Sequence, residues 1–112
     1  KLGYVSWALM EDEGTAKIGV SDLFLKSIEG IKEFELSQPG EELLQGIPCG
    51  EALTLDNLKH EVMCPLSGQV LEVNENALSN PALVEKDPYF RGWLYRILPT
   101  NPKSDLHWLS HG

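Results

Sequence analysis

The chain alternates between short apolar runs and frequent glycine or proline stops, a pattern typical of many short strands. Within most runs the apolar residues recur at every second position, as they do in half-buried strands. The pattern predicts a mainly β domain, a sandwich or barrel with small helices. The expected strands cover 4–10, 15–20, 32–36, 52–55, 58–63, 68–73 and 93–98, with one brief strand inside 39–46.

Helices are expected only between these runs. Ser21 is a residue type that caps helices, and it predicts a short helix over 23–28. Segment 77–84 is expected to be helical or irregular, and Pro81 suits the first turn of a helix. The tail from residue 101 is expected to form a further short helix.

Two hairpins follow from the turn residues. Residues 11–14 are a polar turn between the first two strands. The strands over 52–55 and 58–63 meet at Asp56 and Asn57, residue types that favour tight turns.

Composition narrows the class of protein. The 112 residues are 42% hydrophobic and 23% charged, which is ordinary for one globular domain over 1–112. The net charge of −8 argues against binding to nucleic acid or to an anionic membrane surface. No apolar run approaches the roughly 18 to 20 residues of a membrane span, and the first residues do not resemble a signal peptide. A cytoplasmic location is therefore the default expectation.

The two cysteines, Cys49 and Cys64, lie at equal distances on either side of the Asp56–Asn57 pair. A symmetric hairpin would place them opposite one another, where a bridge is geometrically conceivable. The alternative, which we favour, is two reduced and buried thiols that behave as small apolar residues.

Three groups of motifs resemble the glycine cleavage system H protein family. Residues 65–75 (PLSGQVLEVNE) resemble the family's PVSGEVVEVNE, and 78–93 resemble its L..SP.LV..DPY..GW. Upstream, residues 14–22 and 39–46 follow the family order DGT…VGITD…VGDEL..G. The resemblance implies a lipoyl- or biotinyl-carrier fold, which is a flattened barrel or sandwich of two small sheets with short helices.

The resemblance also implies a function. In the family, a lysine at a hairpin tip forms an amide with lipoic acid. The arm accepts an aminomethyl group from glycine decarboxylase, presents it to a tetrahydrofolate-dependent transferase and is reoxidised by a dehydrogenase. The domain is a carrier rather than a catalyst. The partners implied are these glycine cleavage enzymes or a lipoate ligase.

This sequence departs from the family at the acceptor position. Counting back from Pro65 places the acceptor at Asn57, whereas counting forward from Gly50 places it at Asp56. Neither residue is a lysine, and an amide nitrogen is not a nucleophile at neutral pH. The leading hypothesis is an H-like domain that lacks the lipoylation site, carries no cofactor and acts as a binding or regulatory module.

Lys59 keeps an alternative open, because it is the nearest amine to the tip. It can be a displaced lipoyl acceptor, in which case the chain is a working carrier in glycine cleavage or a related lipoate-dependent system. It can also be a solvated strand residue, as most exposed lysines are. We favour the strand residue.

Other candidate sites carry less weight. His60 and Glu61 are neighbours on a strand, so their side chains are expected to point to opposite faces. His107 and His111 have helical spacing but lack an evident third metal ligand. The acidic residues 11–13 are read as a solvated turn rather than a calcium site. No metal site and no independent enzymatic constellation is expected.

Segment 87–93 contains a last candidate. Phe90 and Arg91 can form a docking surface on this segment. Packing of Tyr89 and Trp93 is the use that we favour for it.

Overall fold

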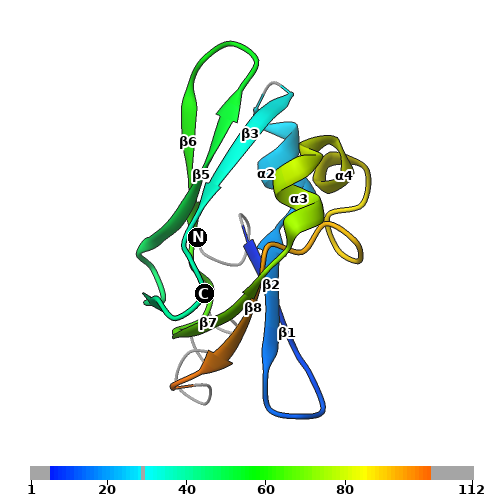
Figure 1. The fold of residues 1–112 in the computed structure, drawn as a ribbon. Coiled ribbons are helices and arrows are strands. Elements are labelled where there is room, and N and C mark those ends of the chain that lie inside the picture. The colour runs from blue at the N-terminus through cyan, green and yellow to red at the C-terminus, as the bar shows by residue number, and fades with distance from the viewer. Residues whose placement is uncertain (1–5, 29, 102–112) are drawn as a thin grey trace.

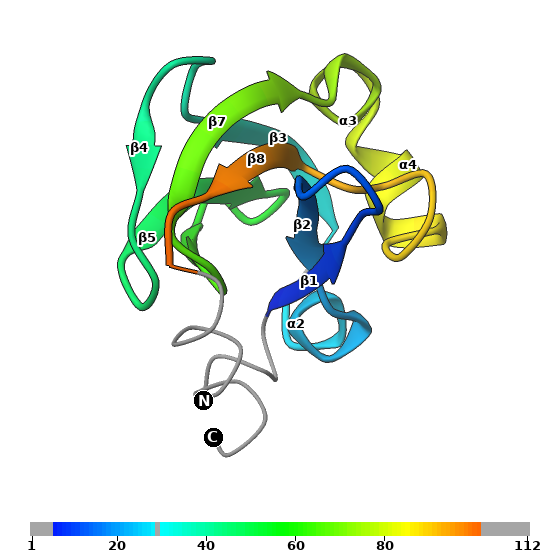
Figure 2. The same ribbon diagram turned by 90° about the horizontal axis from the view of Figure 1, so that it is seen from below.

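The computed structural model describes residues 6–28 and 30–101. Their strands form two antiparallel sheets, shown from the side in Figure 1 and from below in Figure 2. The larger sheet has the order β1 (Ser6–Met10), β2 (Ala16–Val20), β8 (Tyr95–Pro99), β7 (Gly68–Val73) and β4 (Glu42–Leu43). The smaller sheet has the order β3 (Ile31–Leu36), β5 (Pro48–Thr54) and β6 (Lys59–Met63).

Among the described residues, three short helices gather on one side of the fold, with α3 and α4 against β3 (Figure 1). They are α2 (Asp22–Lys26), α3 (Glu75–Ser79) and α4 (Pro81–Lys86). Ser21 caps α2 by accepting a hydrogen bond from the backbone nitrogen of Phe24 at 3.2 Å, as the sequence predicted. No helix within the described ranges has the length and apolarity to cross a membrane. The helix expected from residue 101 onward lies outside the described residues.

The core fills the space between the two sheets. Alternate side chains of the larger sheet point inward, and Ile18, Val70, Tyr95 and Ile97 are almost completely buried. Phe34, Ala52 and Val62 do the same from the smaller sheet. The domain is flattened, with principal extents of 38 × 27 × 21 Å. The expected sandwich of two small sheets with short helices is confirmed, although the two sheets do not join into a closed barrel within the described residues.

Several strand boundaries in the described residues differ from the prediction by one residue, and the starts of β5 and β8 differ by more. β5 begins at Pro48 rather than at residue 52, because a proline is tolerated as the first residue of a strand and a bulge at Cys49 absorbs the irregularity. β8 begins at Tyr95 rather than at residue 93, because the carbonyl of Trp93 accepts a hydrogen bond from Asn74 Nδ2 at 2.7 Å.

Candidate functional site

The candidate site is the tip of the β5–β6 hairpin, which projects away from the rest of the fold (Figure 1). The Thr54 nitrogen donates to the Leu58 carbonyl at 2.9 Å, and the Asn57 nitrogen donates to the Thr54 carbonyl at 2.9 Å. These bonds enclose a three-residue loop, 55–57. The sequence had instead predicted a turn centred on Asp56 and Asn57, and this detail is corrected.

The chemistry of Asp56 and Asn57 explains the longer loop. Asn57 has a φ of 65°, in the left-handed region that asparagine tolerates better than most residues. A three-residue hairpin loop commonly ends in that conformation. The carboxylate of Asp56 accepts hydrogen bonds from the Thr54 hydroxyl and, at 3.3 Å, from the Leu58 nitrogen. The Thr54 hydroxyl bond is the main cause that lowers the pKa of Asp56.

The tip is also hydrogen-bonded to the residue that precedes β3. The Leu55 nitrogen donates to the carbonyl of Gly30 at 2.8 Å, which fixes one side of the loop. The side chains at the apex stay in solvent: Leu55 is 68% exposed and Leu58 is 55% exposed. Hydrogen bonds therefore hold the hairpin tip in place, and it presents apolar side chains and one carboxylate to solvent. Residues 55–58 contain no amine.

Lys59 lies beside the apex, as the first residue of β6, where it pairs with Leu53 in the β5–β6 ladder. Its Nζ is 3.6 Å from Glu35 Oε1, and the two side chains are 54% and 56% exposed. An ion pair this open contributes at most about 1 kcal/mol and leaves the amine accessible to solvent. Lys59 is thus available on the side of the hairpin rather than at its tip.

The two neighbours of Lys59 do not form a catalytic pair. His60 is half-buried, and its Nε2 is buried without a hydrogen-bond partner among the described residues. Glu61 is exposed, on the other face of the strand. Within residues 6–28 and 30–101 no group of three or more His, Cys, Asp or Glu side chains is arranged to hold a metal ion. His107 and His111 lie outside these ranges.

Cys49 and Cys64 form no disulfide and are both buried, at 4% and 0% exposure. The favoured prediction of two buried thiols is confirmed. The symmetric register that would set Cys49 opposite Cys64 is wrong, because Pro48 pairs with Met63, Gly50 pairs with Val62 and Cys49 occupies the bulge between them. A hydrogen bond with the Cys64 thiol, together with burial, raises the pKa of the Cys49 thiol well above its usual range. Burial keeps both thiols from solvent, which is typical of structural cysteines.

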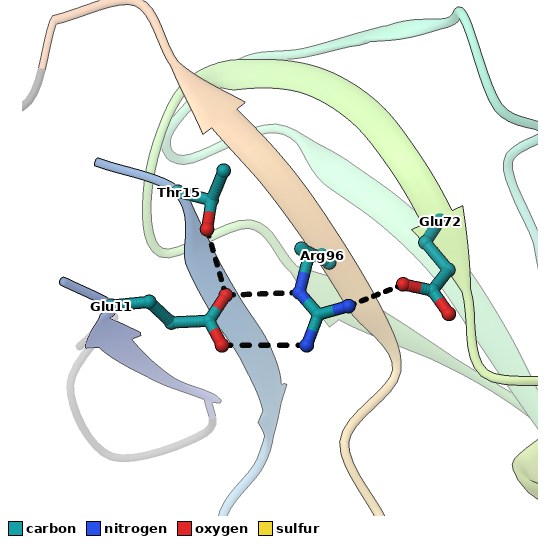
Figure 3. A network of polar contacts seen from close by, with 4 residues as sticks. All are labelled: Glu11, Thr15, Glu72 and Arg96. Atoms are coloured by element: carbon teal, nitrogen blue, oxygen red, sulfur yellow. Dashed lines mark hydrogen bonds and ion pairs between the residues drawn. The ribbon is translucent and has the colours of Figure 1, made fainter. Parts of the chain in front are cut away.

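Arg96 is the centre of a polar network on the larger sheet that the sequence did not indicate (Figure 3). Its Nε donates to Glu11 Oε1 at 2.9 Å, and its Nη1 donates to Glu72 Oε1 at 2.5 Å. The Thr15 hydroxyl also donates to Glu11 Oε1, at 2.8 Å. Since Glu11 and Arg96 are 85 positions apart, no local pattern could have paired them.

The network sets one guanidinium against two carboxylates. Hydrogen bonds from Arg96 and Thr15 lower the pKa of Glu11, and the bond with Glu11 raises the pKa of Arg96. The Arg96 guanidinium therefore links the β1–β2 turn to β8 and β7. It does so through ion pairs with the carboxylates of Glu11 and Glu72. We read the network as structural, and the hairpin tip remains the candidate site.

Comparison with known proteins points to one family. A family model described as "Glycine cleavage H-protein" matches residues 3–112. A probable glycine cleavage system H protein of Aeropyrum pernix is 35% identical over 99 residues, covering 86% of this chain and 66% of that protein. A glycine cleavage system H protein of Prochlorococcus marinus strain MIT 9215 is 37% identical over 93 residues, covering 81% of this chain and 70% of that protein.

A solved structure supports the same assignment. The crystal structure of a glycine cleavage system H protein from Mycobacterium marinum matches with a TM-score of 0.78 and 29% sequence identity. The match covers 86% of this chain and 79% of that chain. Similarity of sequence and of fold therefore agree over most of the chain.

Proposed function

The chain belongs to the glycine cleavage H-protein family, and on that premise we propose that it is an H-type domain without lipoate that serves as a binding or regulatory module for a partner enzyme. The fold is that of a lipoyl carrier, and a carrier of this kind is not itself a catalyst. The proposal takes residues 1–112 as one domain and places it in the cytoplasm. What distinguishes it from a working carrier is the chemistry of the hairpin tip.

The observation that carries the proposal is the apex Leu55-Asp56-Asn57. Attachment of lipoate requires a primary amine, and this apex presents an isobutyl group, a carboxylate and an amide. Both positions to which the family spacing points, Asp56 and Asn57, lie inside the fixed three-residue loop. A ligase that recognises the hairpin apex would find no nucleophile there.

Lys59 supports a second candidate function, a lipoyl carrier with a displaced acceptor. Its amine is more than half exposed and held only by the open pair with Glu35. Against this use, Lys59 belongs to the hydrogen-bonded ladder of β6, opposite Leu53. An arm attached there would leave from the side of the sheet instead of from its projecting end.

Intact mass after coexpression with a lipoate ligase tests the proposal. The set comprises the unchanged chain, D56K, N57K and K59R. D56K and N57K place an amine at each of the two candidate positions, and both are exposed, so both variants are expected to fold. We expect no added mass on the unchanged chain or on K59R, and one lipoyl group on D56K or N57K.

Each alternative result has a definite meaning. A lipoyl group on the unchanged chain that disappears in K59R overturns the proposal and establishes Lys59 as the acceptor. Gain of the group by D56K or N57K shows that the ligase is competent for this fold, so its absence from the unchanged chain then reflects the missing amine.

A further inference from the structure

β6 is an edge strand with one unpaired side. It pairs with β5 in the smaller sheet, and no further strand of the described residues lies beyond it (Figure 1). The backbone hydrogen bonds that the described residues make outside the strand ladders do not involve residues 59–61. An open edge of this kind can pair with another extended strand.

The hydrogen bonds of the hairpin show which backbone groups face the open side. The Thr54 nitrogen bonds to the Leu58 carbonyl, and the next position along β6 is Lys59, opposite Leu53. Bonded and non-bonded pairs alternate along an antiparallel ladder. Lys59 and Glu61 therefore belong to the non-bonded pairs of the β5–β6 ladder. Their N–H and C=O groups point outward, toward the open side.

The side chains at these two outward positions carry opposite charges. Lys59 and Glu61 are both exposed and lie on the same face of the strand. Across the sheet, Glu61 stands in register with Glu51, and Glu51 with Glu35. Three carboxylates therefore share one cross-strand row, where like charges repel. No ion pair within the described ranges involves Glu51 or Glu61, so a positive charge on the open side of Glu61 would relieve this repulsion.

A second copy of β6 supplies that charge in one register. When two β6 strands pair antiparallel about a two-fold axis between their His60 residues, Lys59 of each copy lies opposite Glu61 of the other. The outward backbone groups of both residues then meet and can form hydrogen bonds. An axis at Lys59 or at Glu61 would instead set like charges opposite each other. The alternating charges thus deter strands of unmatched charge and match an antiparallel copy of the same strand.

We propose that the open edge of β6 is the interface of a two-fold homodimer, in which Lys59 of each copy pairs with Glu61 of the other and the two smaller sheets become one continuous sheet. The pair between Lys59 and Glu35 is compatible with this, because both side chains are more than half exposed and an ammonium group has three donors. The dimer engages the amine beside the hairpin tip. The proposal goes beyond the proposed function and does not depend on whether the chain carries lipoate.

Sedimentation velocity of the full chain tests for the dimer. The contact is small, so association is expected between about 10 µM and about 1 mM protein. A salt concentration of about 0.15 M screens the net charge of −8 beyond about 8 Å. The variants are K59E, E61K and the double variant K59E/E61K. K86E and E13K are matched controls, because they make the same two changes in net charge at exposed positions on other parts of the fold.

The unchanged chain is expected to dimerise in this range. K59E and E61K should each weaken the dimer about fivefold or more, because like charges then face each other twice across the axis. The double variant exchanges the charges of each pair and should return to within about threefold of the unchanged chain, with both controls within about twofold. Circular dichroism verifies folding. A chain that stays monomeric, or a double variant weaker than both single variants, overturns the inference.

Cysteine cross-linking tests the register separately. H60C sets two thiols opposite each other at a non-bonded pair, with Cα atoms about 4.5 Å apart and within reach of a disulfide. E61C leaves the two thiols two residues out of register, with Cα atoms more than about 7 Å apart. Oxidised glutathione is expected to cross-link H60C and not E61C. The unchanged chain, whose own two cysteines are buried, is the blank. Cross-linking of E61C instead of H60C, or of neither, overturns this pairing.

Discussion

The hydroxyl of Tyr95 donates a hydrogen bond to the carbonyl oxygen of Cys49 at 2.5 Å, from a strand of one sheet to a strand of the other. The hydroxyl oxygen of Tyr95 in turn accepts a hydrogen bond from the Ser37 nitrogen at 2.7 Å. Tyr95 is fully buried, and burial is the main cause that raises its pKa. The phenol therefore stays protonated and keeps donating throughout the physiological pH range.

Replacing Tyr95 with phenylalanine is expected to lower the free energy of unfolding by about 1–3 kcal/mol. The Ser37 amide loses its acceptor, and the Cys49 carbonyl keeps only the longer bond from the Ser37 hydroxyl, at 3.4 Å. Urea denaturation followed by circular dichroism measures the change. Y89F is the matched control, since Tyr89 is half exposed and water can replace its bonds to Asp22. Equal stability of Y95F and the unchanged chain would contradict this account.

The Glu11–Arg96 pair predicts a pH-dependent contribution to stability. The pKa of Glu11 in the folded chain lies below its ordinary value of 4.5, so the folded chain binds the proton less tightly than the unfolded chain. The contribution is therefore complete above pH 4.5 and is lost as the pH falls through the lowered pKa. E11Q should reduce the free energy of unfolding by up to about 1 kcal/mol at pH 7.

The measurement for E11Q is urea denaturation at pH 7 and at a series of lower pH values. The difference from the unchanged chain should shrink steadily below pH 4.5. E13Q is the control, because Glu13 is exposed in the same turn and no ion pair within the described ranges involves it. A difference for E11Q that persists undiminished at low pH would argue against the carboxylate as its origin.

Gly19 is expected to tolerate no side chain. A Cβ at this position would lie 2.6 Å from the ring of Trp7, whose indole nitrogen donates to the Val20 carbonyl at 3.0 Å. G19A should therefore displace the indole and destabilise the fold by about 1–3 kcal/mol, seen as a lower melting temperature. G30A is the control, because its Cβ would meet the flexible end of Leu55 at 3.0 Å and Glu85 Oε1 at an ordinary contact distance of 3.6 Å. A melting temperature for G19A above that of G30A would contradict the steric argument.

Local patterns predicted most of the elements. β7 was expected at 68–73 and occupies Gly68–Val73, although a register shift between Val70 and Glu72 interrupts its alternation of buried and exposed residues. The α2 cap at Ser21 was predicted from the residue type alone. Both features depend only on neighbours in sequence, so a single sequence contains the information for them.

Features that depend on distant partners were missed or misplaced. Gly50 interrupts the sequence pattern, yet it lies within β5, where a Cβ would approach the carbonyl oxygen of Glu35 to 2.9 Å. The close approach of the neighbouring strand, rather than a turn, accounts for that glycine. The loop at 55–57 was one residue longer than expected, although the tolerance of Asn57 for a left-handed conformation was a usable local signal.

The position of β8 in the larger sheet has a consequence for the order of folding. β8 is the last strand of the described chain, yet it lies between β2 and β7. Until residues 95–99 leave the ribosome, β2 and β7 have no strand to join them, and the larger sheet exists only as separate pieces. The smaller sheet draws its three strands from 31–63 and can pair much earlier. Synthesis of the chain therefore completes the smaller sheet, with its β5–β6 hairpin, before the larger sheet can close over it.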